Sequence, residues 1–520
     1  MNQEEIKNKQ KRVMIYVMIV SLICVVGVSY AFFTAGMSSE TSTTVRADAG
    51  TMKITYSGGA NINLAGIYPK DDVWATKTIT VTGNNTTDAE MYYKLTLVVD
   101  SNTFKTDDPL QYELVSTNTS TNGEIIPNIS KKDITGTSIE LGKGHFVKAN
   151  NAKHTYELKI YYPRKATSQN ASQGSSFSAH VEITSAKAPK TNGKLSELVL
   201  YNNEVKTPIT TPGAAISTAD EALLASAEDD YGTSYYFRGA VTNNYVEFAN
   251  KCWRIVRVGG DGSVKLILHN DNKAGVANPC DAANNSANAA FARYSGTTYK
   301  SKFNTNDNDN AYVGFKYGTP GSSTYETTHA NTNNSTILTN LETWYTNNLK
   351  DYADAIADTE WCNDKTNVKD TTFNPYGYSN VTGSGYAKNV TYYGATQRLV
   401  GTSDSAGGTG PSLKCNGELS KINSKVGLIT ADELAYAGYA YGLQNTTTYL
   451  HENATSDYWW SLSPYSFSGS YAYVWDVYGG VGYIDIHGVN NTRGVRPSIS
   501  LKSTTNVTGN GTSDKPYKVI

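Results

Sequence analysis

Strict alternation of apolar and polar residues recurs between about residues 49 and 186, and it constrains the fold of this region more than any other feature. Residues 52–56, 93–99 and 177–183 each place apolar side chains at every second position. Period-two alternation means that one face of a strand is buried and the other is wet, which is typical of antiparallel sandwiches. We therefore predict a β-sandwich stalk domain over residues 34–190.

The N-terminus combines a basic flank with an uncharged apolar run. Residues 1–12 carry three Lys and one Arg, and residues 13–33 contain no charge. Such a run is long enough to cross a bilayer as a helix, and its basic flank is expected to stay cytoplasmic. Ser29–Ala31 also fits the small-x-small pattern of a signal peptidase site. The segment is either a transmembrane helix or a cleaved signal peptide, and both place the rest of the chain outside the cell.

The first domain resembles the camelysin and biofilm-fibre family of exported β-sandwich proteins. The resemblance is carried by SYAFFT at 29–34, by the strand that follows, and by GNNTTDAEMYYKLTLVV at 83–99. Camelysin has been called a metalloprotease, but this chain has no H-E-x-x-H motif and no clustered His, Asp and Glu at ligand spacing. We predict neither protease activity nor a metal site.

Residues 191–234 are expected to be a linker with a short helix near Ala219–Ala227. A second domain would then occupy residues 235–503, with residues 504–520 as a C-terminal tail. Its first element is a hairpin, in which the strands 252–258 and 264–268 flank a Gly/Asp-rich turn.

Helical signals appear later in this domain. Apolar residues recur at helical spacing from Leu338 to Ile356. Thr430 and Glu433 have the spacing of a capping box, in which each side chain accepts a hydrogen bond from a backbone amide. The predicted fold class is therefore α+β and multidomain: an N-terminal transmembrane helix, an antiparallel β-sandwich and an α+β domain.

The stretch from Tyr458 to Leu501 resembles the C-type-lectin-like, or formylglycine-generating-enzyme-like, fold of bacterial surface proteins. Trp459-Trp460 at its start and Gly494-Val495-Arg496-Pro497 at its close carry the resemblance. The formylglycine-generating enzymes need a cysteine pair near the end of the domain, whereas this chain has no Cys after Cys415. We expect the Trp pair in the core and Arg496 bonded to loop carbonyls, and we predict a binding protein and not an enzyme.

Two segments between the Trp pair and Gly494 have the alternation of strands that expose one face of a sheet. Tyr483, Asp485 and His487 alternate with isoleucines, and Tyr471, Tyr473 and Trp475 alternate with small apolar residues. Tyrosine gives rigid amphipathic contact area, and Ser, Gly and Asn add adaptable hydrogen bonds, as in antibody paratopes. The predicted ligand-binding residues are Tyr465, Phe467, Tyr471, Tyr473, Asp476, Tyr478, Tyr483, Asp485, His487, Asn490, Asn491 and Arg493.

This stretch also resembles the variable region of proteins diversified by retroelements. In those proteins, mutated Asn codons never yield Lys, Glu, Gln or Met, and none of the four occurs from Asn453 to Leu501. The binding face at 465–493 is thus either hypervariable or the fixed surface of an adhesin.

Four of the five cysteines lie beyond the apolar run, which predicts two disulfides in an exported chain. Sequence order favours Cys252–Cys280 and Cys362–Cys415, although other pairings, or four reduced thiols, remain open. The formal net charge of -2 gives no electrostatic case for nucleic acid. Asn306–Asp309 offers oxygen atoms of the kind that Ca²⁺ takes, but it lacks the EF-hand glycine and distal Glu, so we predict a solvated loop and no cofactor.

These features predict a cell-surface adhesin or receptor, either anchored in the cytoplasmic membrane or secreted, that binds an extracellular protein or carbohydrate. Two alternatives remain open: an extracellular enzyme on a formylglycine-generating-enzyme-like fold, and a structural fibre protein of the surface matrix.

Overall fold

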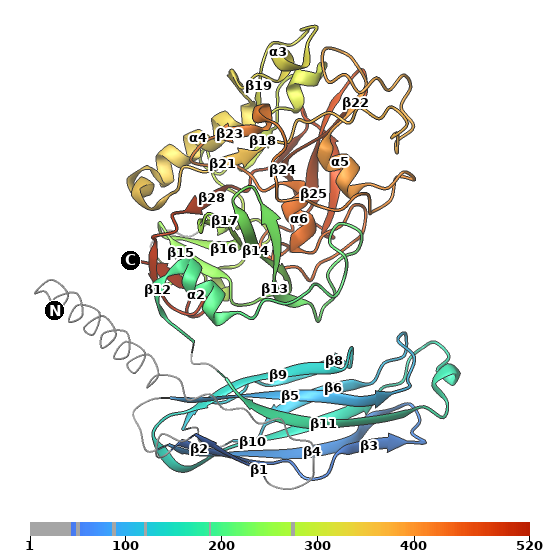
Figure 1. Ribbon diagram of the computed structural model, residues 1–520, viewed down its shortest axis with the longest axis vertical. Helices are drawn as coiled ribbons and strands as arrows, with labels where there is room; N and C mark the ends of the chain where they lie inside the picture. The colour runs from blue at the N-terminus through green and yellow to red at the C-terminus, as the bar shows by residue number, and fades with distance from the viewer. Residues whose placement is uncertain (1–42, 48–51, 86–89, 119–121, 187–188, 272–275) are drawn as a thin grey trace, which may run out of the picture. The chain divides into compact units, whose positions relative to one another are not determined.

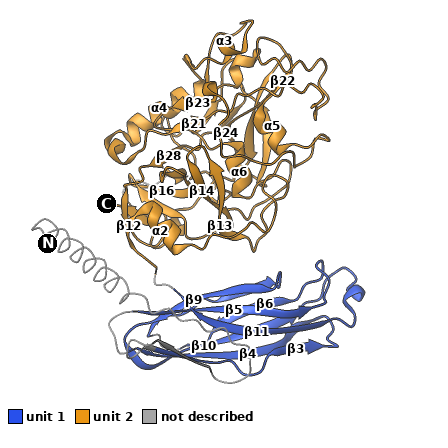
Figure 2. Ribbon diagram, viewed as in Figure 1, with its two compact units in different colours: residues 1–188 blue, residues 189–520 orange. Residues whose placement is uncertain are grey.

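The computed structural model describes residues 43–47, 52–85, 90–118, 122–186, 189–271 and 276–520. The chain divides into two compact units, residues 1–188 and 189–520 (Figure 2). We call them the sandwich unit and the C-terminal unit.

The sandwich unit consists of two antiparallel sheets (Figure 1). The first has the order β1-β2-β4-β10-β6-β8 and the second the order β3-β11-β5-β9-β7. The strands are β1 (Thr43–Ala47), β2 (Met52–Ser57), β3 (Ile62–Ala65), β4 (Lys70–Asn85), β5 (Met91–Asn102), β6 (Gln111–Ser116), β7 (Gly123–Glu124), β8 (Ile129–Asp133), β9 (Ser138–Phe146), β10 (Ala149–Tyr162) and β11 (Ser176–Ser185), with a short 3-10 helix η1 (Asn170–Ser172).

Alternation along these strands builds the core of the sandwich. In β5, every second side chain from Met91 to Val99 is buried, and the intervening ones are half-buried. Leu158 and Ile160 of β10 are fully buried in the same cluster. The predicted β-sandwich is therefore confirmed, because period-two patterning fixes which face of each strand packs inward.

The C-terminal unit contains a nine-stranded sheet. Its main path is β12-β29-β30-β15-β16-β14-β13, and β17 joins β16 to β28. The strands are β12 (Asn192–Lys194), β13 (Ala222–Asp229), β14 (Gly232–Gly239), β15 (Tyr245–Phe248), β16 (Lys251–Val258), β17 (Val264–Asn270), β28 (Ser498–Leu501), β29 (Asn506–Thr508) and β30 (Tyr517–Val519).

A six-stranded sheet follows the order β18-β27-β24-β25-β26, with β22 paired to β24. Its strands are β18 (Lys300–Lys302), β22 (Thr391–Tyr392), β24 (Tyr458–Phe467), β25 (Ala472–Tyr478), β26 (Tyr483–Gly488) and β27 (Thr492–Gly494). Two further pairs are β19 (Lys316–Tyr317) with β20 (Asn333–Asn334) and β21 (Glu360–Cys362) with β23 (Lys421–Asn423).

Short helices complete this unit. The α-helices are α2 (Leu195–Asn202), α3 (Tyr325–His329), α4 (Thr336–Asn348), α5 (Gly394–Leu399) and α6 (Ala431–Ala437). The 3-10 helices are η2 (Ala282–Asn284), η3 (Asn310–Val313), η4 (Lys350–Ala355) and η5 (Glu418–Ser420). One continuous apolar core contains residues of α2, α4, α5 and α6 and of both large sheets.

Several local predictions for this unit are confirmed. β16 and β17 form the predicted hairpin, with Gly262 in its turn at φ 79°. The capping box of Thr430 and Glu433 opens α6. Both expected disulfides form, with Cα separations of 4.9 Å for Cys252–Cys280 and 5.5 Å for Cys362–Cys415.

The signature residues of the C-terminal stretch also lie where the sequence places them. Trp459 and Trp460 are buried in the core. Arg496 is buried too, and it donates hydrogen bonds to the carbonyls of Leu268 (2.9 Å) and Leu450 (2.6 Å).

The predicted linker and tail prove to be parts of the sheet. Residues near Ala219–Ala227 were expected to be helical, but they enter β13, paired with β14, because sheet pairing overrides a weak local preference. The helix of this region is α2, at Leu195–Asn202. Residues 504–520 contribute β29 and β30, and β30 pairs in parallel with β15.

The predicted fold class is corrected: the described chain is mainly β and not α+β. The helical spacing from Leu338 to Ile356 yields the 13-residue α4 and then η4, and α6 stops after seven residues at Gly438. The predicted transmembrane helix at residues 13–33 lies outside the described residues. Within them, no helix is long and apolar enough to span a bilayer.

Candidate ligand-binding site

Strands β24, β25 and β26 set tyrosines and carboxylates opposite one another. In the register of β25 with β26, Asp476 faces Asp485 and Tyr478 faces Tyr483. β24 adds Tyr458, which faces Tyr478 from the other side. Because directly opposed residues of an antiparallel pair project from the same face of a sheet, these five side chains share one face.

His487 and Arg493 complete the group. His487 lies two residues beyond Asp485 on β26, so the alternation of the strand returns it to the same face. Arg493 of β27 places its guanidinium carbon 4.6 Å from the ring centre of Tyr458. We call this group the Asp476 cluster, and its members are Tyr458, Asp476, Tyr478, Tyr483, Asp485, His487 and Arg493.

The rings of the cluster form a continuous half-buried surface. Tyr458 and Tyr478 stack, with ring centres 4.4 Å apart and planes 14° from parallel. Tyr483 meets Tyr478 edge-on at 5.4 Å, and His487 meets Tyr458 edge-on at 4.8 Å. Tyrosine surfaces of this kind offer apolar contact area together with hydroxyl groups, which suits recognition of protein and sugar surfaces.

Asp476 lies at the base of this surface and is completely buried. Its Oδ2 is 2.8 Å from Nδ1 of His487 and 3.5 Å from Nε of Arg493, whereas Oδ1 has no hydrogen-bond partner among the described residues. Burial raises the pKa of Asp476 to about 6, and the hydrogen bond to His487 partly opposes this rise. A buried carboxylate with one free oxygen is unusual, because such atoms normally have a hydrogen-bond partner.

The cluster also contains a potential metal-ligand set that the sequence did not predict. Asp476, Asp485 and His487 each offer a ligand atom, and these atoms all lie within 4.8 Å of one another. The residues come from two strands, so their spacing along the chain gives no sign of the grouping.

The structure brings together six of the twelve residues predicted to bind ligand and leaves six apart. Those in the cluster are Asp476, Tyr478, Tyr483, Asp485, His487 and Arg493. Tyr465 and Phe467 are buried in the core, and Tyr471 is 54% exposed beyond the cluster. The remaining three are Tyr473, Asn490 and Asn491.

Those three residues have other surroundings. Tyr473 is half-buried on the opposite face of β25, because its position differs from that of Asp476 by an odd number. Asn490 donates a hydrogen bond to Asp307 Oδ2 at 2.7 Å, and Asn491 donates one to the Gly488 carbonyl at 3.0 Å.

Two further findings concern this sheet. Trp475, which was expected on the displayed face, is fully buried, and Tyr465 meets it edge-on at 5.0 Å. Tyr458 was missed as a site residue, although it directly precedes the Trp pair. Its role depends on the register of β24 with β25, which the sequence does not reveal.

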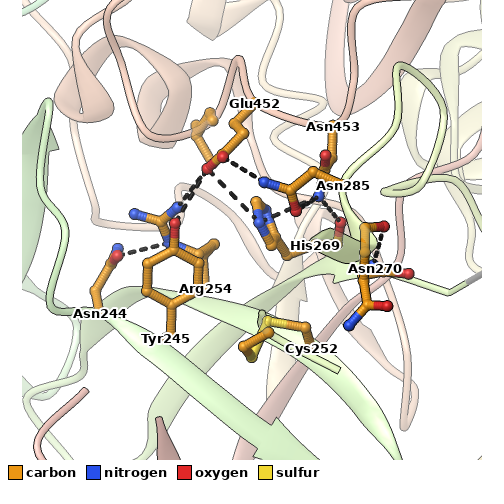
Figure 3. A network of polar contacts seen from close by, with 12 residues as sticks. Asn244, Tyr245, Cys252, Arg254, His269, Asn270, Asn285, Glu452 and Asn453 are labelled. Atoms are coloured by element: carbon orange, nitrogen blue, oxygen red, sulfur yellow. Dashed lines mark hydrogen bonds and ion pairs between the residues drawn. A yellow bond between two sulfur atoms is a disulfide. The ribbon is translucent and has the colours of Figure 1, made fainter. Parts of the chain in front are cut away.

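A second polar network lies beside the Cys252–Cys280 bridge (Figure 3). Glu452 accepts hydrogen bonds from Tyr245 (3.1 Å), Arg254 (3.3 Å) and Asn285 (2.6 Å). Arg254 also donates to Asn244, at 2.6 Å. With so many internal partners, Glu452 connects β15 and β16 to distant loops, and we assign the network a structural role.

A small cavity of about 50 Å³ adjoins the Cys362–Cys415 bridge and has a charged lining. Glu433 is 2.9 Å from Arg257 and 2.7 Å from Lys265. Arg398 bonds to both Asp364 and Asp432 at 2.7–2.8 Å. These cations and carboxylates are paired with one another, so we assign them a structural role.

A comparison with protein-family models finds no matching family, and a comparison with curated proteins finds no matching sequence. The resemblances to the camelysin family and to the C-type-lectin-like fold therefore stay predictions, and the function must be argued from the site.

Proposed function

We propose that this protein is a bacterial surface protein that acts outside the cytoplasm and binds a protein or carbohydrate ligand through the Asp476 cluster. The observation that carries the proposal is the half-buried tyrosine surface set around a buried carboxylate with one free oxygen. Two disulfides support an oxidising location, because such bridges persist mainly outside the cytoplasm.

The chemistry of the cluster defines the ligand class. Stacked tyrosines favour the apolar face of a sugar ring or an aromatic side chain, and the carboxylates and Arg493 favour hydroxyl, amide and carboxylate groups. All four cysteines of the C-terminal unit are paired, which leaves that unit without a free thiol for an oxidase-type reaction. This favours the binding protein over the enzyme alternative.

The test is ligand capture by the full chain on a glycan array and on panels of extracellular proteins. The double variant Tyr478→Ala/Tyr483→Ala should lose capture by tenfold or more, with little change in thermal unfolding. The matched control is Tyr376→Ala/Tyr471→Ala, which removes two tyrosines that are 48% and 54% exposed outside the cluster. Equal capture by both variants, or loss in the control alone, would refute the assigned face.

A further inference from the structure

Three side chains with metal-binding atoms converge on the face of β25 and β26. Asp476 and Asp485 are directly opposed, and His487 follows on the same face. Their ligand atoms lie within 4.8 Å of one another. Asp476 Oδ2 lies 2.8 Å from Nδ1 of His487, so these two atoms are paired with each other, and Oδ1 is the oxygen of Asp476 that is left for an ion.

A second observation points to a ligand at this place. Asp476 is fully buried, and its Oδ1 has no hydrogen-bond partner among the described residues. Leaving a buried acceptor unsatisfied costs roughly 1–3 kcal/mol, and more for a charged group. A cation at Oδ1 would remove that cost, and it would also relieve the repulsion between Asp476 and Asp485.

The charged side chains around Asp476, Asp485 and His487 do not neutralise the two carboxylates. Arg493 Nε lies 3.5 Å from Asp476 Oδ2, so one positive charge faces the two carboxylates. Lys300 of β18 is held by an ion pair with Asp457. The two carboxylates and Arg493 together carry a net charge of about −1, which favours a bound cation.

We propose that Asp476, Asp485 and His487 bind one divalent transition-metal ion, with Zn²⁺ the best match, and that this ion holds an oxygen of the ligand. The inference rests on the proposed function of the same face. Imidazole nitrogen and carboxylate oxygen are both ligand types that Zn²⁺ accepts, whereas Ca²⁺ takes oxygen ligands alone. Three protein ligands leave a fourth position open, and the half-burial of Asp485 and His487 turns that position toward solvent.

The experiment is calorimetric titration of the full chain with Zn²⁺ alone, after removal of metal by a chelator. We expect one ion per chain, and at least tenfold weaker binding in the variants Asp485→Asn and His487→Gln. These two side chains are half-buried, so their replacement should leave thermal unfolding nearly unchanged, unlike replacement of the buried Asp476. Ca²⁺ in place of Zn²⁺ should give no comparable binding.

The sandwich unit supplies a matched control. His180 there lies between Asp100 (2.9 Å) and Glu182 (3.5 Å), so one histidine and two carboxylates meet on a strand surface here too. The variant Asp100→Asn/His180→Gln should bind Zn²⁺ as the parent does. Unchanged Zn²⁺ affinity in Asp485→Asn and His487→Gln, or loss in the control variant, would overturn the metal site.

A second readout separates this inference from the proposed function. We expect the Asp485→Asn and His487→Gln variants to lose ligand capture on the array together with Zn²⁺. If they lose Zn²⁺ and capture ligand normally, the role of the metal in recognition is overturned, while the tyrosine surface stays supported by its own variant. If the Tyr478→Ala/Tyr483→Ala variant binds Zn²⁺ and captures ligand, the proposed function fails and the metal site stands.

Discussion

The sandwich unit and the C-terminal unit reach stability by different means. The sandwich has long strands, such as the 16 residues of β4 and the 14 of β10, with buried side chains at alternate positions. The C-terminal unit has shorter strands, longer loops and both disulfides of the described residues. It also buries ion pairs, among them Glu433 with Arg257 and Lys265.

This difference shows that regular strand pairing can stabilise a unit without cross-links, whereas long loops need them. A sandwich satisfies its backbone hydrogen-bonding groups within the sheets and buries one apolar face of each strand. The alternating sequence pattern is therefore nearly sufficient to specify its fold. Loops leave backbone groups and charges to be satisfied by distant partners. A loop-rich unit therefore depends on specific cross-links, and a single change in one of them should have a large effect there.

Reduction of the two disulfides should give the largest difference in stability between the two units. The bridges close loops of 28 and 53 residues in sequence separation, and chain entropy assigns each roughly 4 kcal/mol of stability. We expect the C-terminal unit to unfold at much lower urea concentration in reductant. Six of the seven tryptophans belong to this unit, so their fluorescence follows it.

The stability of the sandwich unit should not change in reductant, and hydrogen exchange of its backbone amides measures this. An equal loss of protection in both units would break the comparison.

Replacement of Glu433 by Gln should have the next largest effect. Burial works to raise the pKa of Glu433, but Lys265 and Arg257 outweigh it and hold that pKa at about 2. The neutral variant leaves the buried Lys265 without its carboxylate, whereas Arg257 keeps Asp229 at 2.8 Å. Breaking a buried ion pair in this way costs roughly 3–5 kcal/mol. Chemical unfolding followed by tryptophan fluorescence measures it.

The control is Glu228→Gln, in the exposed part of β13, for which we expect a change within about 0.5 kcal/mol. Similar stabilities of the two variants would show that the charge network contributes nothing to this unit.

Acid should have a smaller effect on the sandwich, through its buried histidine. His154 lies 2.7 Å from the Tyr93 hydroxyl, and burial, together with the charge of His145, lowers its pKa to about 4. The pKa in the unfolded chain is about 6.5, so the unfolded state binds the proton first. The stability that the neutral imidazole contributes is therefore complete above pH 6.5 and is lost as the pH falls to 4, by at most about 3 kcal/mol.

The variant His154→Phe keeps an aromatic ring against Phe146, with which His154 stacks at 4.1 Å. Between pH 6.5 and 4, we expect a flatter dependence of sandwich stability on pH for this variant than for the parent. Parallel curves would exclude His154 as the origin of the acid sensitivity. The measurement sharpens the comparison, because it tests whether a buried histidine makes the sandwich unit sensitive to acid.

The two units also differ in how much of them could be predicted. The alternation in β5 and β11 predicted the sandwich, and Thr430 with Glu433 predicted the start of α6. The Asp476 cluster was predicted only in part. β26 showed its alternation, but β25 did not, since Trp475 and Asp476 are both buried while only Tyr473 and Tyr478 of this strand are half-exposed. A strand covered on both faces loses the pattern that would identify its displayed side.

Neighbours along the chain are enough to specify the period of the strands, the hairpin turn at Gly262 and the capping box. Which distant residues come together depends on the tertiary structure. The pairing of β24 with β25 and of β25 with β26 brings Tyr458, Asp476 and Asp485 together. Register joins residues far apart in the chain, and its free energy comes from the packing of whole strands, so no local pattern records it.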